Sequence, residues 1–190
     1  MKFRKIIIIA ITVVVLILII SIVNQISVNH LDKTTPEYGI AQYVQTYGVS
    51  SQAKINYNID KNKLYAFIDD PHGSSYGVIG VQNNEGVYDL NLDASYDSTL
   101  IIPDSTEYIQ SIILYEANGE YLFLFRTSNE FQDVTNLSIS DNNGVELEKM
   151  ESEDKTVAAF FYCVDSLSSD FKFVCNYNGL EETVIDINDI

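Results

Sequence analysis

The stretch from Gly73 to Gly77 (GSSYG) fits the G-x-S-x-G pattern in which serine hydrolases hold their nucleophile. His72 stands directly before it, and Asp69 and Asp70 lie just upstream. In those enzymes the serine sits on a strained turn between a strand and a helix. Here residues 76–82 (YGVIGVQ) follow, and their valines, isoleucine and glycines are typical of a strand. The pattern therefore predicts a hairpin connection made of ordinary turn residues rather than a nucleophile elbow.

The partners that a catalytic serine needs are also missing. In hydrolases with this motif the histidine follows the serine along the chain. No histidine follows His72, and His30, the other one, lies near the N-terminal apolar segment. We therefore predict that Ser75 is not a nucleophile and that the chain has no catalytic residues.

Cys163 and Cys175 could form a disulfide. They lie symmetrically about residue 169 in a predicted hairpin of residues 156–164 and 171–177, and their positions place them on one face. Opposed residues of an antiparallel pair bring their Cβ atoms to within about 5.5 Å, which suits a bridge in an exported domain. Two reduced, buried thiols are the equal alternative. A metal site is disfavoured because no histidine or third cysteine stands nearby.

Asp89, Asn91 and Asp93 alternate along one predicted strand and are weak calcium candidates. Calcium needs six to eight oxygen ligands, so these three alone do not complete a site. A solvated strand face is the default interpretation. The 13 tyrosines could stack on sugars or peptides, although most fall on apolar strand faces and predict core packing. No cluster of residues predicts a cofactor or a bound metal.

The N-terminal residues predict a membrane anchor. Residues 1–5 carry three cations, and residues 6–23 contain no charge over 18 positions. A helix of that length spans about 27 Å, close to the hydrocarbon core of a bilayer of about 30 Å. A cleaved signal peptide would need a small-x-small site, a lipoprotein a cysteine, and a type IV prepilin a glycine followed by a glutamate; none is present. The positive-inside rule predicts a cytoplasmic stub (1–5), a transmembrane signal anchor (6–23) and an external remainder that begins with a stalk (24–35).

The exported remainder is strongly acidic. All 27 Asp and Glu lie beyond the anchor with only eight of the 11 Lys and Arg, which gives a net charge of −19. Such a surface repels phosphate backbones, so we expect no binding of nucleic acid.

Residues 36–103 predict a small α+β unit. Thr35 suits a helix N-cap, Pro36 the first helical position and Gly48 the C-terminal cap. Strands with period two follow, of which 63–69 (KLYAFID) alternates Leu64, Ala66 and Ile68 with Tyr65 and Phe67. The expected unit is a helix covering one face of an antiparallel sheet of four or five strands, the last of which is 98–103 (STLIIP).

Residues 104–190 predict an immunoglobulin-like β-sandwich of six to eight short strands. Asn118-Gly119 is the pair required by a two-residue type I′ turn. In the strand that follows, residues 121–125 (YLFLF) are apolar on both faces, which is typical of a central strand covered on both sides. Further hairpins are expected around 134–150 and 156–177, with 180–187 as the closing strand. The chain is thus mostly β, and α+β overall.

The chain resembles uncharacterised single-anchor envelope proteins of low-GC Gram-positive bacteria. The resemblance covers most of residues 36–187 and rests on three blocks, TPEYGIAQYV, the pair KLYAFIDD and YGVIGVQ, and YLFLFRTSNEFQDVTNLSISDNNGVELEK. It implies the layout above and neither a catalytic residue nor a ligand.

The expected function is non-catalytic binding at the cell envelope. The bilayer would hold residues 6–23 in a single-pass topology at the cell membrane, with an envelope protein or a wall polymer as the external partner. An envelope hydrolase and an accessory subunit of a membrane complex are the alternatives. A deep cleft with converging ionisable groups would favour the enzyme, and filled cores beside an exposed apolar patch or sheet edge would favour binding.

Overall fold

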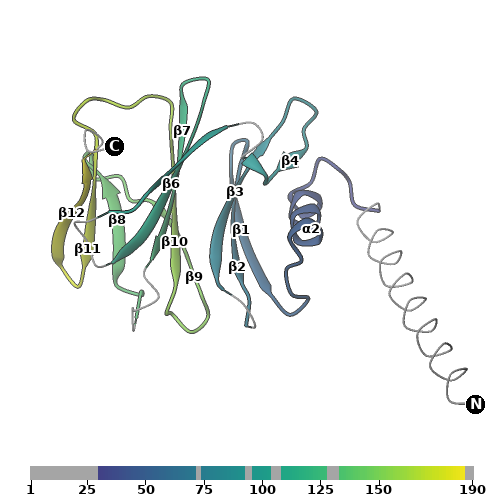
Figure 1. Ribbon diagram of the computed structural model, residues 1–190, viewed down its shortest axis with the longest axis horizontal. Coiled ribbons are helices and arrows are strands. Elements are labelled where there is room, and N and C mark those ends of the chain that lie inside the picture. The colour runs from purple at the N-terminus through teal and green to yellow at the C-terminus, as the bar shows by residue number, and fades with distance from the viewer. Residues whose placement is uncertain (1–29, 72–73, 93–95, 104–107, 128–132, 187–190) are drawn as a thin grey trace, which may run out of the picture.

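The computed structural model describes residues 30–71, 74–92, 96–103, 108–127 and 133–186, with the backbone alone for 181–186. These residues stack in four layers, a helix followed by three antiparallel sheets (Figure 1). The expected anchor, residues 6–23, lies outside the described residues. Within the described ranges no helix is long and apolar enough to cross a membrane.

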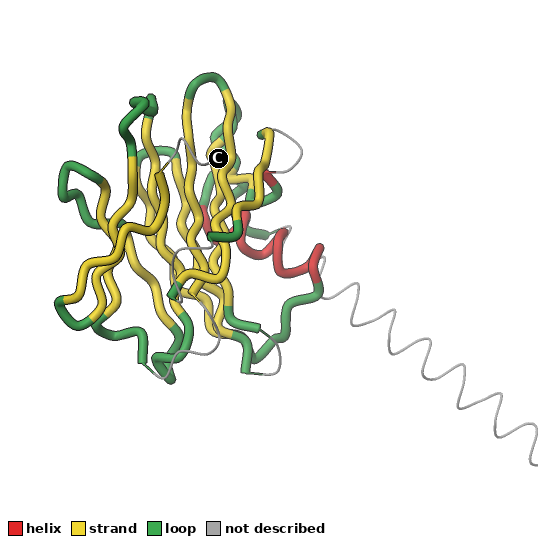
Figure 2. The backbone as a smooth tube through the Cα atoms, turned by 60° about the vertical axis from the view of Figure 1, so that its left-hand side comes forward, coloured by secondary structure: helices red, strands yellow, loops and turns green. Residues whose placement is uncertain are grey.

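The first layer is helix α2, Pro36–Tyr47. Proline at its start and Gly48 at its end, with φ of 66°, confirm the predicted boundaries. The Thr35 side chain does not cap the helix, since its hydroxyl donates to the carbonyl of Asp32 at 2.8 Å. Gly39 has a packing role, because a Cβ there would lie 2.6 Å from the carbonyl oxygen of Tyr88. Figure 2 shows the helix set against one side of the stacked sheets.

Sheet A is the second layer, with the strand order β1-β2-β3-β4. Its strands are β1 (Lys54–Asp60), β2 (Lys63–Asp69), β3 (Tyr76–Gln82) and β4 (Tyr88–Asp89). Leu64 and Ile68 of β2 pack toward the helix, where Ile40 and Tyr43 meet them. Tyr65 and Phe67 pack on the opposite face against sheet B. The alternation predicted for β2 is therefore confirmed.

Sheet B is the central layer, with the strand order β5-β6-β7-β10-β9. Its strands are β5 (Asp97–Ile101), β6 (Ile109–Ala117), β7 (Glu120–Thr127), β10 (Ala158–Val164) and β9 (Glu148–Glu151). Asn118 and Gly119, with φ of 55° and 78°, make the predicted tight turn between β6 and β7. Leu122 and Leu124 of β7 face sheet A, and the phenylalanines between and after them face the third sheet. The prediction of a central strand covered on both faces is confirmed.

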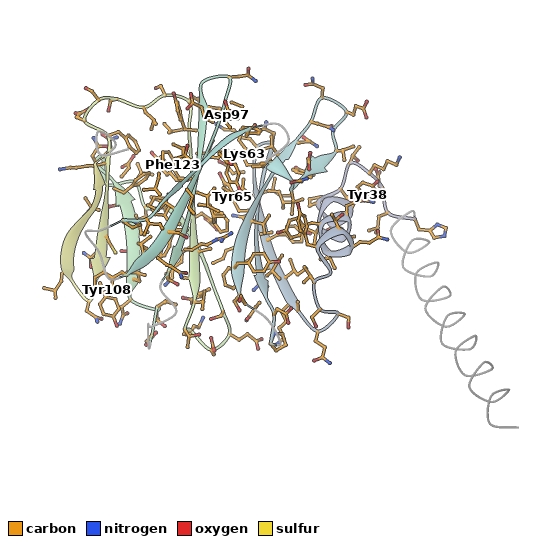
Figure 3. The ribbon with its side chains drawn as sticks, viewed as in Figure 1. Tyr38, Lys63, Tyr65, Asp97, Tyr108 and Phe123 are labelled. Carbon is orange, nitrogen blue, oxygen red and sulfur yellow. The ribbon has the colours of Figure 1, made fainter. Side chains whose placement is uncertain are left out.

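Sheet C is the outer layer, with the strand order β12-β11-β8. Its strands are β12 (Leu180–Asp186), β11 (Lys172–Tyr177) and β8 (Leu137–Asp141). Sheets B and C enclose the largest core, in which Phe173 contacts Phe123 and Phe125 edge-to-face at ring-centroid distances of 5.0 Å and 4.7 Å. Figure 3 labels Phe123 in this core and Tyr65 in the core between sheets A and B.

Two of the predicted strand pairings are wrong, and a third is present only at its turn. Strand β5 pairs with β6 of sheet B and not with sheet A, so the last strand expected in the first unit belongs to the second sheet. Strands β10 and β11 do not form a hairpin, because β10 pairs with β7 and β9 whereas β11 pairs with β8 and β12. The end of β8 and residues 145–147 form the turn of the predicted hairpin, with the bridge Ser140–Glu146 and a backbone hydrogen bond from Leu147 to Ile139, but β9 itself pairs with β10 of sheet B.

Candidate functional site

A cleft lies where sheet A leaves part of sheet B uncovered. Sheet A packs on the central sheet through β3 against β7 and β10, and through β2 near β9. Strands β5 and β6 continue sheet B beyond this overlap, so their face toward sheet A remains open and forms the floor of the cleft. Helix α2 and the segment after β4 form the opposite wall. The cleft thus follows from the offset between two sheets of different width.

The cleft encloses about 380 Å³. This volume is within the range of about 300–1,000 Å³ that is typical of small-molecule sites. Strands β5, β6 and β7 of sheet B each contribute two residues to the floor. The wall comes from helix α2, β3 and the segment after β4. The floor residues are Ser98, Leu100, Ile113, Tyr115, Leu124 and Arg126, and the wall residues are Tyr43, Tyr47, Gly77, Val78, Leu90, Asn91 and Leu92.

Arg126 carries the single positive charge among these lining residues. It lies near the end of β7 and continues the row of Leu122 and Leu124 that faces sheet A. Its Nε atom is buried and has no hydrogen-bond partner within the described part of the chain. No aspartate or glutamate is among the described residues that line the cleft. The guanidinium therefore stands in an apolar and aromatic setting without a lining carboxylate.

Two tyrosines of helix α2 close the cleft opposite Arg126. The rings of Tyr43 and Tyr47 lie 4.5 Å apart between centroids. Burial raises the pKa of Tyr43 first, and its neighbour Tyr76, which is hydrogen-bonded to it, raises that pKa further. Tyr43 is therefore neutral at pH 7, and its hydroxyl is engaged in the hydrogen bond with Tyr76. Helix α2 thus brings two aromatic side chains, and β7 one guanidinium, to the lining of the same cleft.

The rim of the cleft is an exposed apolar patch on an edge strand. Leu100 of β5 is 63% exposed, Ile102 just beyond β5 is 69% exposed, and Tyr47 across the cleft is 51% exposed. Strand β5 is the last strand of sheet B, and the described residues place no neighbour on its outer side. Such an edge commonly pairs with another polypeptide unless it is protected.

The GSSYG stretch lies at the connection between β2 and β3. Gly73 and His72 lie outside the described residues, but Ser75 is followed directly by strand β3, as predicted, and not by a helix. The Ser75 hydroxyl donates to Asp69 Oδ1 at 2.7 Å, and the other oxygen of Asp69 accepts from the Glu153 backbone N–H at 2.9 Å. Ser75 thus helps Asp69 to join sheet A to the turn between β9 and β10, which is a structural role.

A buried ion pair lies at the other end of the interface between sheets A and B. Lys63, which is 4% exposed, pairs with Glu120 and donates to Asn62 Oδ1 at 2.8 Å. Tyr96 donates weakly to the second Glu120 oxygen at 3.5 Å, and the Cys163 thiol lies 3.8 Å from the first. Figure 3 labels Lys63 in this position. The charges satisfy each other, so the cluster fixes the two sheets rather than presenting a reactive group.

The geometric basis of the predicted disulfide is wrong. Cys163 lies in β10 and packs into the core between sheets A and B, whereas Cys175 lies in β11 and is buried between sheets B and C. Within the described residues both side chains are thiols rather than halves of a bridge. Desolvation raises the pKa of Cys163 to about 11, an effect to which Glu120 adds and which Lys63 opposes.

The calcium candidates do not assemble into a site. Asp89 and Asn91 are both exposed, and Asp89 Oδ1 accepts from the Asn91 backbone N–H at 2.8 Å. Asp93 lies outside the described residues. Among the residues that are described, no group of three or more histidine, cysteine, aspartate or glutamate side chains is placed to hold a metal ion.

Arg126 was missed from the sequence, although a signal for it exists. It is the one cation in residues 121–127 (YLFLFRT), and it shares the parity of Leu122 and Leu124. A charged residue on an apolar face of a central strand is unusual enough to mark a site.

Comparison with known proteins finds no family model, no curated protein and no solved structure that matches this chain.

Proposed function

We propose that this chain is a non-catalytic binding module of the bacterial cell envelope that takes its ligand in the cleft between helix α2, sheet A and strand β5. The observation that carries the proposal is the open half of the sheet B face, which is walled by tyrosines and rimmed by exposed apolar residues. Contiguous apolar surface of this kind is typical of interaction sites.

The chemistry of the lining favours binding over catalysis. Its polar side-chain groups are serine and tyrosine hydroxyls, one amide and one guanidinium, and the part of the lining that the structure describes has no histidine, cysteine, aspartate or glutamate. A hydrolytic site needs a base beside its nucleophile or a metal-activated water. The lining offers no such base for Ser98. The cores between the sheets are filled with buried apolar side chains, which fits a rigid scaffold for recognition.

The strand order supports an immunoglobulin-like classification of sheets B and C. With β6 as the first strand, the order β6-β7-β10-β9 facing β12-β11-β8 corresponds to the ABED and GFC sheets of a constant-type immunoglobulin domain. Strand β5 then extends the first sheet at its edge, and sheet A covers the outer face of that sheet. Sandwiches of this type serve many functions, so the classification supports the scaffold and not a particular ligand.

The location in the proposal comes from the N-terminal sequence. Residues 6–23 would span the cell membrane once, with residues 1–5 in the cytoplasm and the remainder outside, as in the single-anchor envelope proteins of low-GC Gram-positive bacteria that the chain resembles. Tethering raises the effective concentration of the module for a partner near the membrane. We propose an envelope protein or a wall polymer as that partner, and no nucleic acid because of the acidic exterior.

Site-specific crosslinking in intact cells tests the function. A photoreactive amino acid at Leu100, which is 63% exposed at the cleft, should give a discrete crosslinked product. The matched control is Leu180 on β12, which is 68% exposed on the far sheet and should give none. Equal labelling from both positions, or labelling only from Leu180, would place the interaction surface elsewhere and contradict the proposal.

A further inference from the structure

The charge of the cleft is the reverse of the charge of the exported region. That region carries a net charge of −19, yet the described residues that line the cleft include one cation and no acidic side chain. The overall field repels free anions, whereas the local group at the end of the cleft attracts one. An anionic group that enters here must therefore be held by further contacts with the ligand that carries it.

The setting of Arg126 points to a planar anion. A buried N–H without a hydrogen-bond acceptor costs free energy, and Nε of the partly exposed Arg126 has no acceptor among the described residues. A carboxylate matches the fork of the guanidinium and can accept two parallel hydrogen bonds. Tyr43 and Tyr47 add aromatic rings to the wall of the same cleft. The guanidinium by itself offers a carboxylate more than one N–H donor.

From this arrangement we infer that the cleft binds the carboxyl-terminal end of an extended peptide, with the terminal carboxylate on Arg126 and an apolar last side chain on Leu100, Ile113 and Leu124. The inference rests on the proposed binding function and names the ligand class for the same cleft. Capture of a terminal carboxylate is an established way in which domains recognise peptides.

The surroundings of Arg126 favour a peptide over other carboxylates. The floor beside it is made of branched apolar side chains, which suit a Leu, Ile or Val residue. The rim offers Ser98 and Asn91 as polar groups for a peptide backbone. On the open side lies β5, an edge strand without an outer neighbour among the described residues, along which an extended chain could leave the cleft. A carboxylated sugar would use the tyrosines but not this apolar floor.

The test compares two probes that differ only at the carboxyl end. Full-length protein in lipid nanodiscs is titrated with N-acetyl-Leu-Leu and with its C-terminal amide, and binding is followed by calorimetry and by NMR shifts of the protein. We expect the acid to bind roughly tenfold or more tightly than the amide, as expected for hydrogen bonds to a charged group. Arg126→Gln should remove this preference, and Arg126→Lys should keep part of it. The control Lys172→Gln removes an equal charge from the exposed side of β11 and should leave the preference unchanged.

A second pair of variants keeps the test valid if Arg126→Gln fails to fold. Leu100 is 63% exposed, so Leu100→Asp and Leu100→Lys should both fold. The aspartate should weaken binding of the acid by about threefold or more and the lysine should not, because only the aspartate repels the carboxylate. The new charge of either variant should leave the affinity for the amide unchanged, because the amide carries no charge.

Three outcomes would overturn the inference. They are equal affinity for the acid and the amide, no detectable binding of either at millimolar concentration, and binding of an N-acetylated, carboxylated amino sugar in place of the peptide acid. If the crosslink from Leu100 still forms in cells under any of these outcomes, the ligand class is wrong and the proposed function stands. If that crosslink is also absent, both fail.

Discussion

The backbone of Gly77 in β3 lies directly against the side chain of Ala159 in β10. A Cβ added at Gly77 would come within 2.6 Å of Ala159 Cβ, 2.8 Å of Leu124 Cδ1 and 2.9 Å of Phe161 Cζ. Two sheets normally pack about 10 Å apart, with side chains filling the space between them. At this point the glycine and the alanine bring them closer. The contact also sets the inner edge of the cleft, since Gly77 and Leu124 both line it.

Gly77→Ala should destabilise the protein by about 1–3 kcal/mol, because the added methyl group overpacks a core that is already filled. Denaturant unfolding of the full chain in detergent measures the loss. Combining it with Ala159→Gly should restore part of the space, so the double variant should lose less stability than the two single losses predict. Additive losses in the double variant would show that the two residues do not contact each other.

The pair of Lys63 and Glu120 should behave as a buried ion pair. Glu120→Leu removes the counter-charge of an ammonium group that is 4% exposed, so we expect a loss of about 2–4 kcal/mol. Adding Lys63→Met to Glu120→Leu should recover stability, because two apolar side chains can replace a buried pair. The exposed pair of Lys54 and Glu153 is the control, and Glu153→Gln should change the free energy of unfolding by less than about 1 kcal/mol. If the double variant regains no free energy of unfolding relative to Glu120→Leu, Lys63 and Glu120 do not form a buried ion pair.

Both cysteines should be slow to react in the folded protein. Cys163 has its pKa raised to about 11, chiefly by burial, and Cys175 is fully buried. At pH 8 about one Cys163 in a thousand is then the reactive thiolate. We expect almost no alkylation by iodoacetamide under native conditions and two adducts after unfolding without reductant, as read by intact mass. An unfolded protein that gains adducts only after reduction would contain a disulfide.

Asp69 should contribute more to stability than Ser75 does. Ser75→Ala removes one hydrogen bond to Asp69 and should cost about 1 kcal/mol, without loss of fold. Asp69→Ala also frees the backbone N–H of Glu153 and should cost more. Thermal unfolding of the two variants checks the order. A larger loss for Ser75→Ala than for Asp69→Ala would mean that the serine has a further role.

Local patterns were enough to predict the elements of this fold. Proline and glycine fixed the ends of helix α2, the Asn118-Gly119 pair fixed the turn between β6 and β7, and alternation of apolar residues assigned both faces of β2. These features depend on residues within a few positions of each other. Their physical causes, backbone dihedral preferences and burial of one face, are therefore visible in a short window.

The pairing of strands across sheets was not predictable in the same way. The segments with Cys163 and Cys175 have the spacing of a hairpin, but their connection crosses the sandwich and delivers each strand to different partners. Which sheet a strand joins depends on contacts between residues far apart in sequence. The cleft has the same origin, because Arg126 and Tyr43 meet only through the offset of sheet A over sheet B. No local pattern contains that offset.

Asp141 connects the two sheets of the sandwich and should make stability depend on pH. It ends β8, is 3% exposed, and accepts hydrogen bonds from the N–H groups of Asn143 and Val145, each at 2.8 Å, and from the Tyr162 hydroxyl of β10 at 2.7 Å. Burial alone raises the pKa of Asp141, but these hydrogen bonds outweigh it and hold the pKa below its ordinary value. The ionised carboxylate is therefore the form that stabilises the fold.

The sign of the pH effect follows from that direction. A carboxyl group whose pKa is lower in the folded state contributes stability that is fully present above its unfolded pKa of about 3.9, and that is lost as the pH falls through the folded value. Asp141→Asn should therefore lower the free energy of unfolding at pH 7 by about 1–3 kcal/mol and flatten its fall below about pH 4. The control Asp165→Asn removes the same charge from an exposed loop and should stay within about 0.5 kcal/mol of the parent protein. If denaturant unfolding shows the same acid dependence in Asp141→Asn as in the parent protein, other carboxylates hold the sandwich together at low pH.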